Sequence, residues 1–178
     1  MSFISTVNDP GKRGAMHRIT IEWEGPFTLD QVIKKYDDGG EHPHYDGKDY
    51  GLYQIYGRHI LDDPKAPTYK SLLYLGEATE QTFASRFRGH KRSWLEHEWK
   101  ESISIYVGRF NAPYRTDKDW KTDVLLAERI LVYTYSPHYN SSSISTRPRL
   151  AGHKEVVVVH RGERGLLRGR DVIPKDWE

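Results

Sequence analysis

The chain contains no cysteine, which excludes disulfide bonds, thiolate zinc sites and cysteine nucleophiles. No apolar run approaches the roughly 18 residues that a membrane-spanning helix needs. The first ten residues lack the basic and apolar regions of a signal peptide. With 178 residues and a mean hydropathy of −0.77, the chain fits one polar domain. These features are compatible with a reducing cytoplasm, and we expect a cytoplasmic protein with no membrane partner.

Aromatic residues and unevenly placed charges are present in quantity. Five Trp, twelve Tyr and five Phe supply large surfaces to bury, so we expect a folded core. The formal net charge is only +2, but residues 22–49 carry −5, residues 86–100 carry +3 and residues 147–170 carry +5. A basic second half suits a polyanion-binding face, and ordinary solvated surface is the alternative reading.

Hydrophobic periodicity predicts an α+β fold with a mainly antiparallel central sheet flanked by helices. The predicted strands are 17–24, 50–56, 71–75, 102–110 and 154–160. A helix capped by Thr28 carries an apolar stripe up to Tyr36, a second helix opens at Thr79, and a third spans 122–135. We expect an N-terminal extension (1–49) packed on a core (50–141), followed by a basic C-terminal strand and tail (142–178), in one compact domain.

Glu128 is the most unusual residue of the third predicted helix. Its neighbours three and four positions away are all apolar: Val124, Leu125, Leu131 and Val132. Because an unpaired buried charge is costly, this carboxylate must reach solvent, pair with a cation or bind a metal.

Arg86 and His90 share one face of the second predicted helix, since they are four residues apart. A guanidinium offers a planar fork of donors for phosphate, and an imidazole transfers protons near neutral pH. The alternative is a basic face exposed to solvent. The pair His42 and His44 has no third ligand at a regular spacing, so we expect a loop there.

Two glycine-bearing tripeptides lie on neighbouring predicted strands, Gly51-Leu52-Tyr53 and Tyr74-Leu75-Gly76. With the helix bearing Arg86, the helix bearing Glu128 and then Asn140, they resemble the GIY-YIG nuclease superfamily. The spacing of Arg86-Phe-Arg-Gly-His90, and of Asn140 twelve residues after Glu128, is most similar to its type II restriction endonuclease branch. The twenty residues between Tyr53 and Tyr74 exceed the compact family pattern.

The resemblance covers residues 50–140 and implies a Mg²⁺- or Mn²⁺-dependent DNA endonuclease with one ion per active site. It implies that Glu128 holds the ion, that Arg86 binds the phosphate, and that Tyr53 is the general base. Asn140 would fix a phosphate or the active-site loop, and Tyr74 or His90 would relay the proton. We expect further basic residues to contact the DNA backbone: Arg88, Lys91, Arg92, Arg147 and Arg149.

Three alternatives stay open at this point. The same chemistry serves repair, mobile-element or single-strand nucleases, and a binding module that no longer cleaves is a different class. Whether Tyr53 or His90 is the base is also open, because a phenol needs more pKa adjustment than an imidazole. Cutting both strands of a palindrome would favour a homodimer.

Overall fold

A computed structural model describes residues 16–36, 49–58, 70–91, 95, 102–140, 148–150, 152, 153 and 155–174. Along the chain these residues form nine elements. The strands are β1 (Met16–Phe27), β2 (Gly51–Gly57), β3 (Ser71–Ala78), β4 (Ser104–Phe110), β5 (Glu155–Gly162) and β6 (Arg170–Pro174). The helices are α1 (Leu29–Lys35), α2 (Phe83–Lys91) and α3 (Asp117–Tyr135). None of the described helices is long and apolar enough to cross a membrane.

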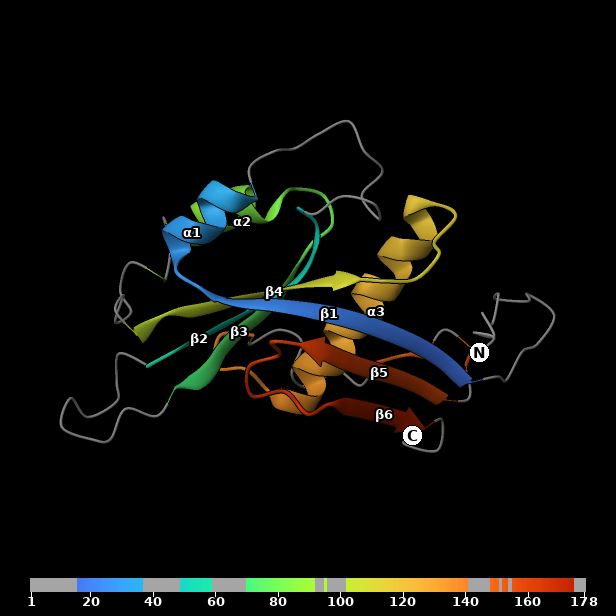
Figure 1. The fold of residues 1–178 in the computed structure, drawn as a ribbon. Helices are drawn as coiled ribbons and strands as arrows, with labels where there is room; N and C mark the ends of the chain where they lie inside the picture. Colours follow the sequence, from blue (N-terminus) through green and yellow to red (C-terminus); the bar gives the residue numbers. More distant parts are fainter. Residues whose placement is uncertain are drawn as a thin grey trace.

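The strands form one curled sheet in the order β3-β2-β4-β1-β5-β6 (Figure 1). Among the described strands, only β1 and β5 pair in parallel, and the other four pairings are antiparallel. The α+β class and the mainly antiparallel sheet are therefore confirmed. The segment that sequence analysis placed in an N-terminal extension supplies β1, which lies inside the sheet between β4 and β5.

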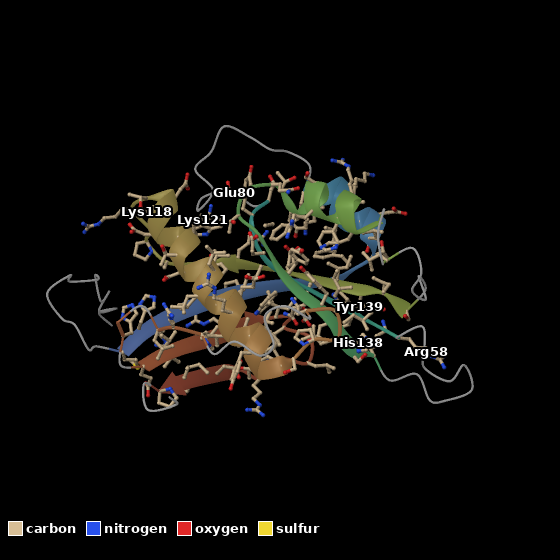
Figure 2. All side chains as sticks on the ribbon, turned by 180° about the vertical axis from the view of Figure 1, so that it is seen from behind. Arg58, Glu80, Lys118, Lys121, His138 and Tyr139 are labelled. Atoms are coloured by element: carbon tan, nitrogen blue, oxygen red, sulfur yellow. The ribbon has the colours of Figure 1, made fainter. Side chains whose placement is uncertain are left out.

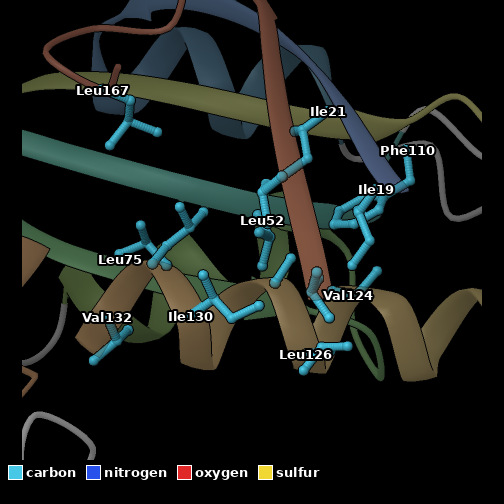
Figure 3. Packing of buried hydrophobic residues seen from close by; sticks show 14 of the residues in the cluster. Ile19, Ile21, Leu52, Leu75, Phe110, Val124, Leu126, Ile130, Val132 and Leu167 are labelled. Atoms are coloured by element: carbon cyan, nitrogen blue, oxygen red, sulfur yellow. The ribbon is translucent and has the colours of Figure 1, made fainter. Parts of the chain in front are cut away.

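Helices cover both faces of the sheet. The long helix α3 packs on one face, against side chains that alternate along the strands, such as Ile19 and Ile21 of β1 (Figure 3). The helices α1 and α2 pack on the other face, over Tyr53, Ile55 and Val107. The strand β3 lies at one edge of the sheet and contacts α3.

Helix starts follow their capping residues. Thr28 forms a capping box with Gln31 at the start of α1, as expected. The helix expected to open at Thr79 begins instead at Phe83, because the hydroxyl of Thr82 accepts the Ser85 amide and the Thr79 amide binds the Glu77 carboxylate. The predicted helix continues past α2 to Trp94, which lies outside the described residues.

Two further boundaries differ from the sequence-based expectation. The helix α3 begins at Asp117 rather than 122, because Thr116 accepts the Asp119 amide as an N-cap and Trp120 already packs in the core. The expected basic tail contains a strand, β6, whose Asp171 and Ile173 are buried while Val172 is exposed. The predicted loop at 37–49, including His42 and His44, is undescribed except at Asp49.

Candidate active site

Tyr53 and Tyr74 meet on the face of the sheet that α1 and α2 cover. The strands β2 and β3 are antiparallel neighbours, with Tyr53 opposite Gly76 and Ile55 opposite Tyr74. The two phenol rings stack with centroids 5.9 Å apart and 23° between their planes. A Cβ atom on Gly76 would lie 2.6 Å from the Tyr53 hydroxyl and 2.5 Å from the Tyr74 ring. The glycine therefore leaves the space that the two tyrosines occupy.

The helix α2 brings Arg86 and His90 to the same place. His90 Nε2 lies 2.7 Å from the Tyr53 hydroxyl, and the two rings meet edge to face. The positive charge of the Arg86 side chain also acts on Tyr53. Its Nε atom is buried and has no hydrogen-bond partner among the described residues. A partly buried guanidinium with an unused donor is suited to a further acceptor, such as a phosphate oxygen.

Burial has the largest effect on the pKa values of Tyr53 and His90. It raises the pKa of Tyr53 well above 10, and the neighbouring Tyr74 adds to the effect while Arg86 opposes it. Burial, and then the positive charge of Arg86, lowers the pKa of His90 to about 4. At neutral pH the imidazole is therefore uncharged and able to accept a proton, and the phenol keeps its own.

Glu128 belongs to α3, on the other side of the edge strand. Burial raises the pKa of Glu128 to about 7, the nearby charge of Glu77 raises it further, and Arg129 and Arg86 oppose the shift. The positive charge of Arg86, which belongs to α2, thus reaches Glu128 on α3. Glu128 is a partly buried carboxylate on which the charges of two arginines act.

Glu77 is a site residue that the sequence analysis missed. Its charge acts on Tyr53, Tyr74, Arg86 and Glu128, and therefore on every ionisable group described above except His90. Its Oε2 atom accepts hydrogen bonds from the Thr79 amide at 2.7 Å and the Thr79 hydroxyl at 2.6 Å. The available signal was its position directly after Gly76.

Asn140 holds the edge of β3. Its Oδ1 accepts the Leu75 amide at 2.9 Å and its Nδ2 donates to the Leu75 carbonyl at 2.7 Å. The Tyr139 amide donates to the Leu73 carbonyl in the same way. Both polar groups of Asn140 thus bind the backbone of β3 at Leu75, between Tyr74 and Gly76. This fits a role in fixing the segment of the active site that carries Tyr74. They would have to exchange these bonds to bind a phosphate.

Only two of the five residues expected to contact the DNA backbone have side chains that the structure describes. Arg88 is exposed on α2 and Arg149 is exposed before β5. Lys91 closes α2, but its side chain is outside the description, as are Arg92 and Arg147. The structure therefore places two of these five side chains, both in contact with solvent.

A surface groove of about 370 Å³ runs beside the first turns of α3. It lies between α3 and the segment that follows β3, where Lys121 and Glu80 form an ion pair across it (Figure 2). The groove ends at Leu125, one helical turn before Glu128. It bears both signs of charge and contains none of the expected site residues.

The donor set at Glu128 is compatible with a hard divalent cation. Carboxylate oxygens suit Mg²⁺, which keeps several water ligands and needs few protein ligands. Two carboxylates, Glu128 and Glu77, repel each other in partly buried positions, and a cation between them would remove that cost. In the described part of the chain, no three His, Asp or Glu side chains gather into a metal cage. The fit is therefore to an ion held mainly by water and substrate.

Comparison with protein-family models, curated proteins and solved structures found no match to this chain.

Proposed function

We propose that this protein is a GIY-YIG-like, divalent-metal-dependent endonuclease that hydrolyses phosphodiester bonds in DNA. The observation that carries the proposal is the hydrogen bond between Tyr53 and His90, at 2.7 Å, with the positive charge of Arg86 acting on the same phenol. The groups come from one strand and one helix, and Tyr74 stacks on them from a second strand. The element order also supports the proposal: strand, strand, arginine helix, strand and glutamate helix.

The residues divide the chemistry of hydrolysis among them. Arg86 binds the phosphate and compensates for charge on its non-bridging oxygens, using the donor that has no protein partner. Glu128 and its neighbour Glu77 would hold the cation, which would supply Lewis-acid stabilisation of the charge on the phosphate and the leaving oxygen. Tyr74 packs against Tyr53 and orients the attacking water, and Asn140 keeps the Tyr74–Gly76 segment of β3 in place.

Proton transfer runs through the Tyr53–His90 pair. Since burial opposes ionisation of Tyr53, a phenolate waiting for substrate is disfavoured. A neutral His90 accepts the phenol proton at Nε2 as Tyr53 takes a proton from water. This route makes Tyr53 the group that touches water and His90 the final acceptor.

A restriction role is the form of this activity that the Arg86–His90 spacing and Asn140 favour. Repair, mobile-element and single-strand nucleases use the same chemistry, and a non-cleaving module would retain only DNA binding. Cleavage of both strands of a palindrome by a homodimer is the arrangement expected of a restriction enzyme, and sedimentation in the presence of DNA measures it.

The test is nicking of supercoiled plasmid with Mg²⁺, with Mn²⁺ and with EDTA. We expect cleavage only with a metal, and its loss in Glu128→Gln, which removes the charge at nearly constant shape. Glu155→Gln, at the start of β5, is the matched control and should cut normally. A chain that binds plasmid but never cuts it would be the binding module. A chain that neither binds nor cuts would refute the proposal.

A further inference from the structure

The loop between β5 and β6 presents an apolar side chain to solvent. Leu166 is 69 % exposed, the largest exposed fraction among the described large hydrophobic residues. Its neighbour Leu167 is 3 % exposed and belongs to the core under α3. The two adjacent leucines thus have opposite roles: one anchors the loop and the other projects from it.

Hydrogen bonds fix this loop to three other elements. The Glu163 amide donates to the Trp23 carbonyl of β1 at 3.0 Å. The Leu166 amide donates to the Tyr56 hydroxyl of β2 at 3.1 Å, and the Arg168 amide donates to the Tyr135 hydroxyl of α3 at 2.9 Å. The exposed position of Leu166 is therefore built into the fold.

Backbone conformation adds to this restraint. Gly162 and Gly165 have φ values of +67° and +61°, in the left-handed region that glycine tolerates best. A Cβ atom on Gly162 would meet the Trp23 carbonyl oxygen at 2.3 Å, and one on Gly165 would meet the Tyr56 ring at 2.7 Å. The loop backbone therefore lies against β1 and β2 more closely than a side chain would allow.

Four arginines lie close in sequence to the projecting leucine. Arg164 and Arg168 are exposed on the loop, and Arg161 and Arg170 are exposed on the strands beside it, against one acidic residue, Glu163. Of these four arginines, only Arg161 forms an ion pair with another described residue, at 3.6 Å from Glu22. The loop thus combines a fixed apolar tip with two guanidinium groups, those of Arg164 and Arg168, that form no ion pair with a carboxylate of the described residues.

The exposed leucine and the neighbouring arginines together restrict the kind of molecule that the loop could bind. A second copy of the chain, meeting through a two-fold axis, would bring the same arginines against themselves. A duplex nucleic acid instead offers two rows of phosphates with a groove between them, whose floor of base edges accepts an apolar wedge. The charge pattern and the projecting leucine both fit that surface.

We propose that the loop 163–169 docks in the minor groove of duplex DNA, with Arg164 and Arg168 on flanking phosphates and Leu166 inserted against the base pairs. The inference rests on the proposed function, because it names how the same DNA substrate is held. Phosphate contacts supply affinity without sequence choice, whereas a wedge favours base steps that open easily. Leu166 would therefore contribute to site selection.

Three variants, with two control variants, test this docking. Leu166→Ser removes the wedge, and Val172→Ser is its control, an exposed apolar residue on β6. Arg164→Gln and Arg168→Gln remove phosphate contacts, and Arg18→Gln on β1 is the control for lost charge. Binding to a 30-base-pair duplex is followed by anisotropy over a range of salt concentrations, and 2-aminopurine in the duplex reports unstacking.

Leu166→Ser should bind duplex about tenfold more weakly, lose the 2-aminopurine signal and keep its salt dependence. Arg164→Gln and Arg168→Gln should each lower the slope of log K against log salt by about 1, whereas the control Arg18→Gln should leave that slope unchanged. The inference is wrong if Leu166→Ser matches Val172→Ser, or if its only effect is on self-association in sedimentation. If wild-type protein cuts plasmid and Leu166→Ser binds duplex as tightly as wild type, this inference alone is refuted. If wild-type protein binds no DNA, the proposed function is refuted too.

Discussion

Two buried clusters in this protein contain tyrosine and histidine, and they differ in how their polar groups are satisfied. In the first, around Tyr53 and His90, Arg86 retains a buried donor without a partner. In the second, between β1, β5, β6 and the end of α3, Trp23 donates to His160 Nδ1 at 3.0 Å. His160 Nε2 therefore carries the proton, which it donates to Asp171 at 3.1 Å.

The second cluster is complete. The hydroxyl of Tyr135 donates to Asp171 at 2.9 Å and accepts the Arg168 amide. A fully satisfied buried network fixes the fold, whereas an incomplete one beside perturbed groups marks a place where chemistry can occur. If the Tyr53 cluster is catalytic, as proposed, and the His160 cluster is structural, the two clusters should respond differently to substitution.

The largest expected effect is on catalysis, from Tyr53→Phe. The ring keeps its packing against Phe87 and Tyr74, so the free energy of unfolding should change by only about 1 kcal/mol. Loss of the proton-transferring hydroxyl should slow single-turnover cleavage about 10²–10⁴-fold. Cleavage at the wild-type rate would make Tyr53 a packing residue, and loss of pH dependence in His90→Gln alone would make the imidazole the base.

Asp171→Ala should show the opposite pattern. It leaves the His160 N–H and the Tyr135 hydroxyl without their acceptor in the core, at a cost of about 3 kcal/mol in the free energy of unfolding. Urea denaturation measures this loss, and the cleavage rate per folded molecule should stay unchanged. A large fall in that rate, at a temperature where the variant is folded, would contradict the division between the clusters.

The pH dependence of stability separates Glu128 from His90. Folding raises the pKa of Glu128 from 4.5 to about 7, so its stabilising contribution is complete below pH 4.5 and is lost as pH rises to about 7. Relative to wild type, Glu128→Gln should gain up to about 3 kcal/mol in unfolding free energy across that window, measured in EDTA. A constant difference would mean that Glu128 is not desolvated.

His90 should act in the opposite direction. Folding lowers its pKa from 6.5 to about 4, so the unfolded chain binds the extra proton and stability is lost as pH falls from 6.5 to 4. Relative to wild type, His90→Gln should therefore gain stability as the pH falls. In the wild type the two groups nearly offset each other, and equal pH profiles for both variants would contradict this account.

The smallest expected effect comes from Asn140→Leu. Loss of both hydrogen bonds to Leu75 should lower the free energy of unfolding by about 2 kcal/mol. Cleavage should slow less than in Tyr53→Phe, because Asn140 acts through β3. Salt titrations of DNA binding by wild type and by Asn140→Leu distinguish the two roles of Asn140. An unchanged slope of log K against log salt supports the structural role, and a slope smaller by one phosphate contact supports direct binding of a phosphate by Asn140.

Local features were predictable because neighbours in sequence determine them. The capping box at Thr28 and the shared face of Arg86 and His90 depend on contacts within four residues. The strand β6 was missed because it has only five residues, among arginines and glycines, and its alternation is short. The choice of Thr82 over Thr79 as a helix cap depended on Glu77, whose side chain already binds Thr79.

The sequence by itself determined which residue types are present and which lie on one helix or strand face: the tyrosines with their glycines, the Arg86–His90 pair, and a glutamate on an apolar helix. Tertiary structure decided that β1 enters the middle of the sheet, that Tyr53 meets His90, and that Glu77 acts on Glu128. These contacts join residues 37 positions or more apart. Hydrophobic periodicity indicates only the local structure of a segment. Which distant strands pair, and in which register, depends on how well their side chains pack in the folded protein.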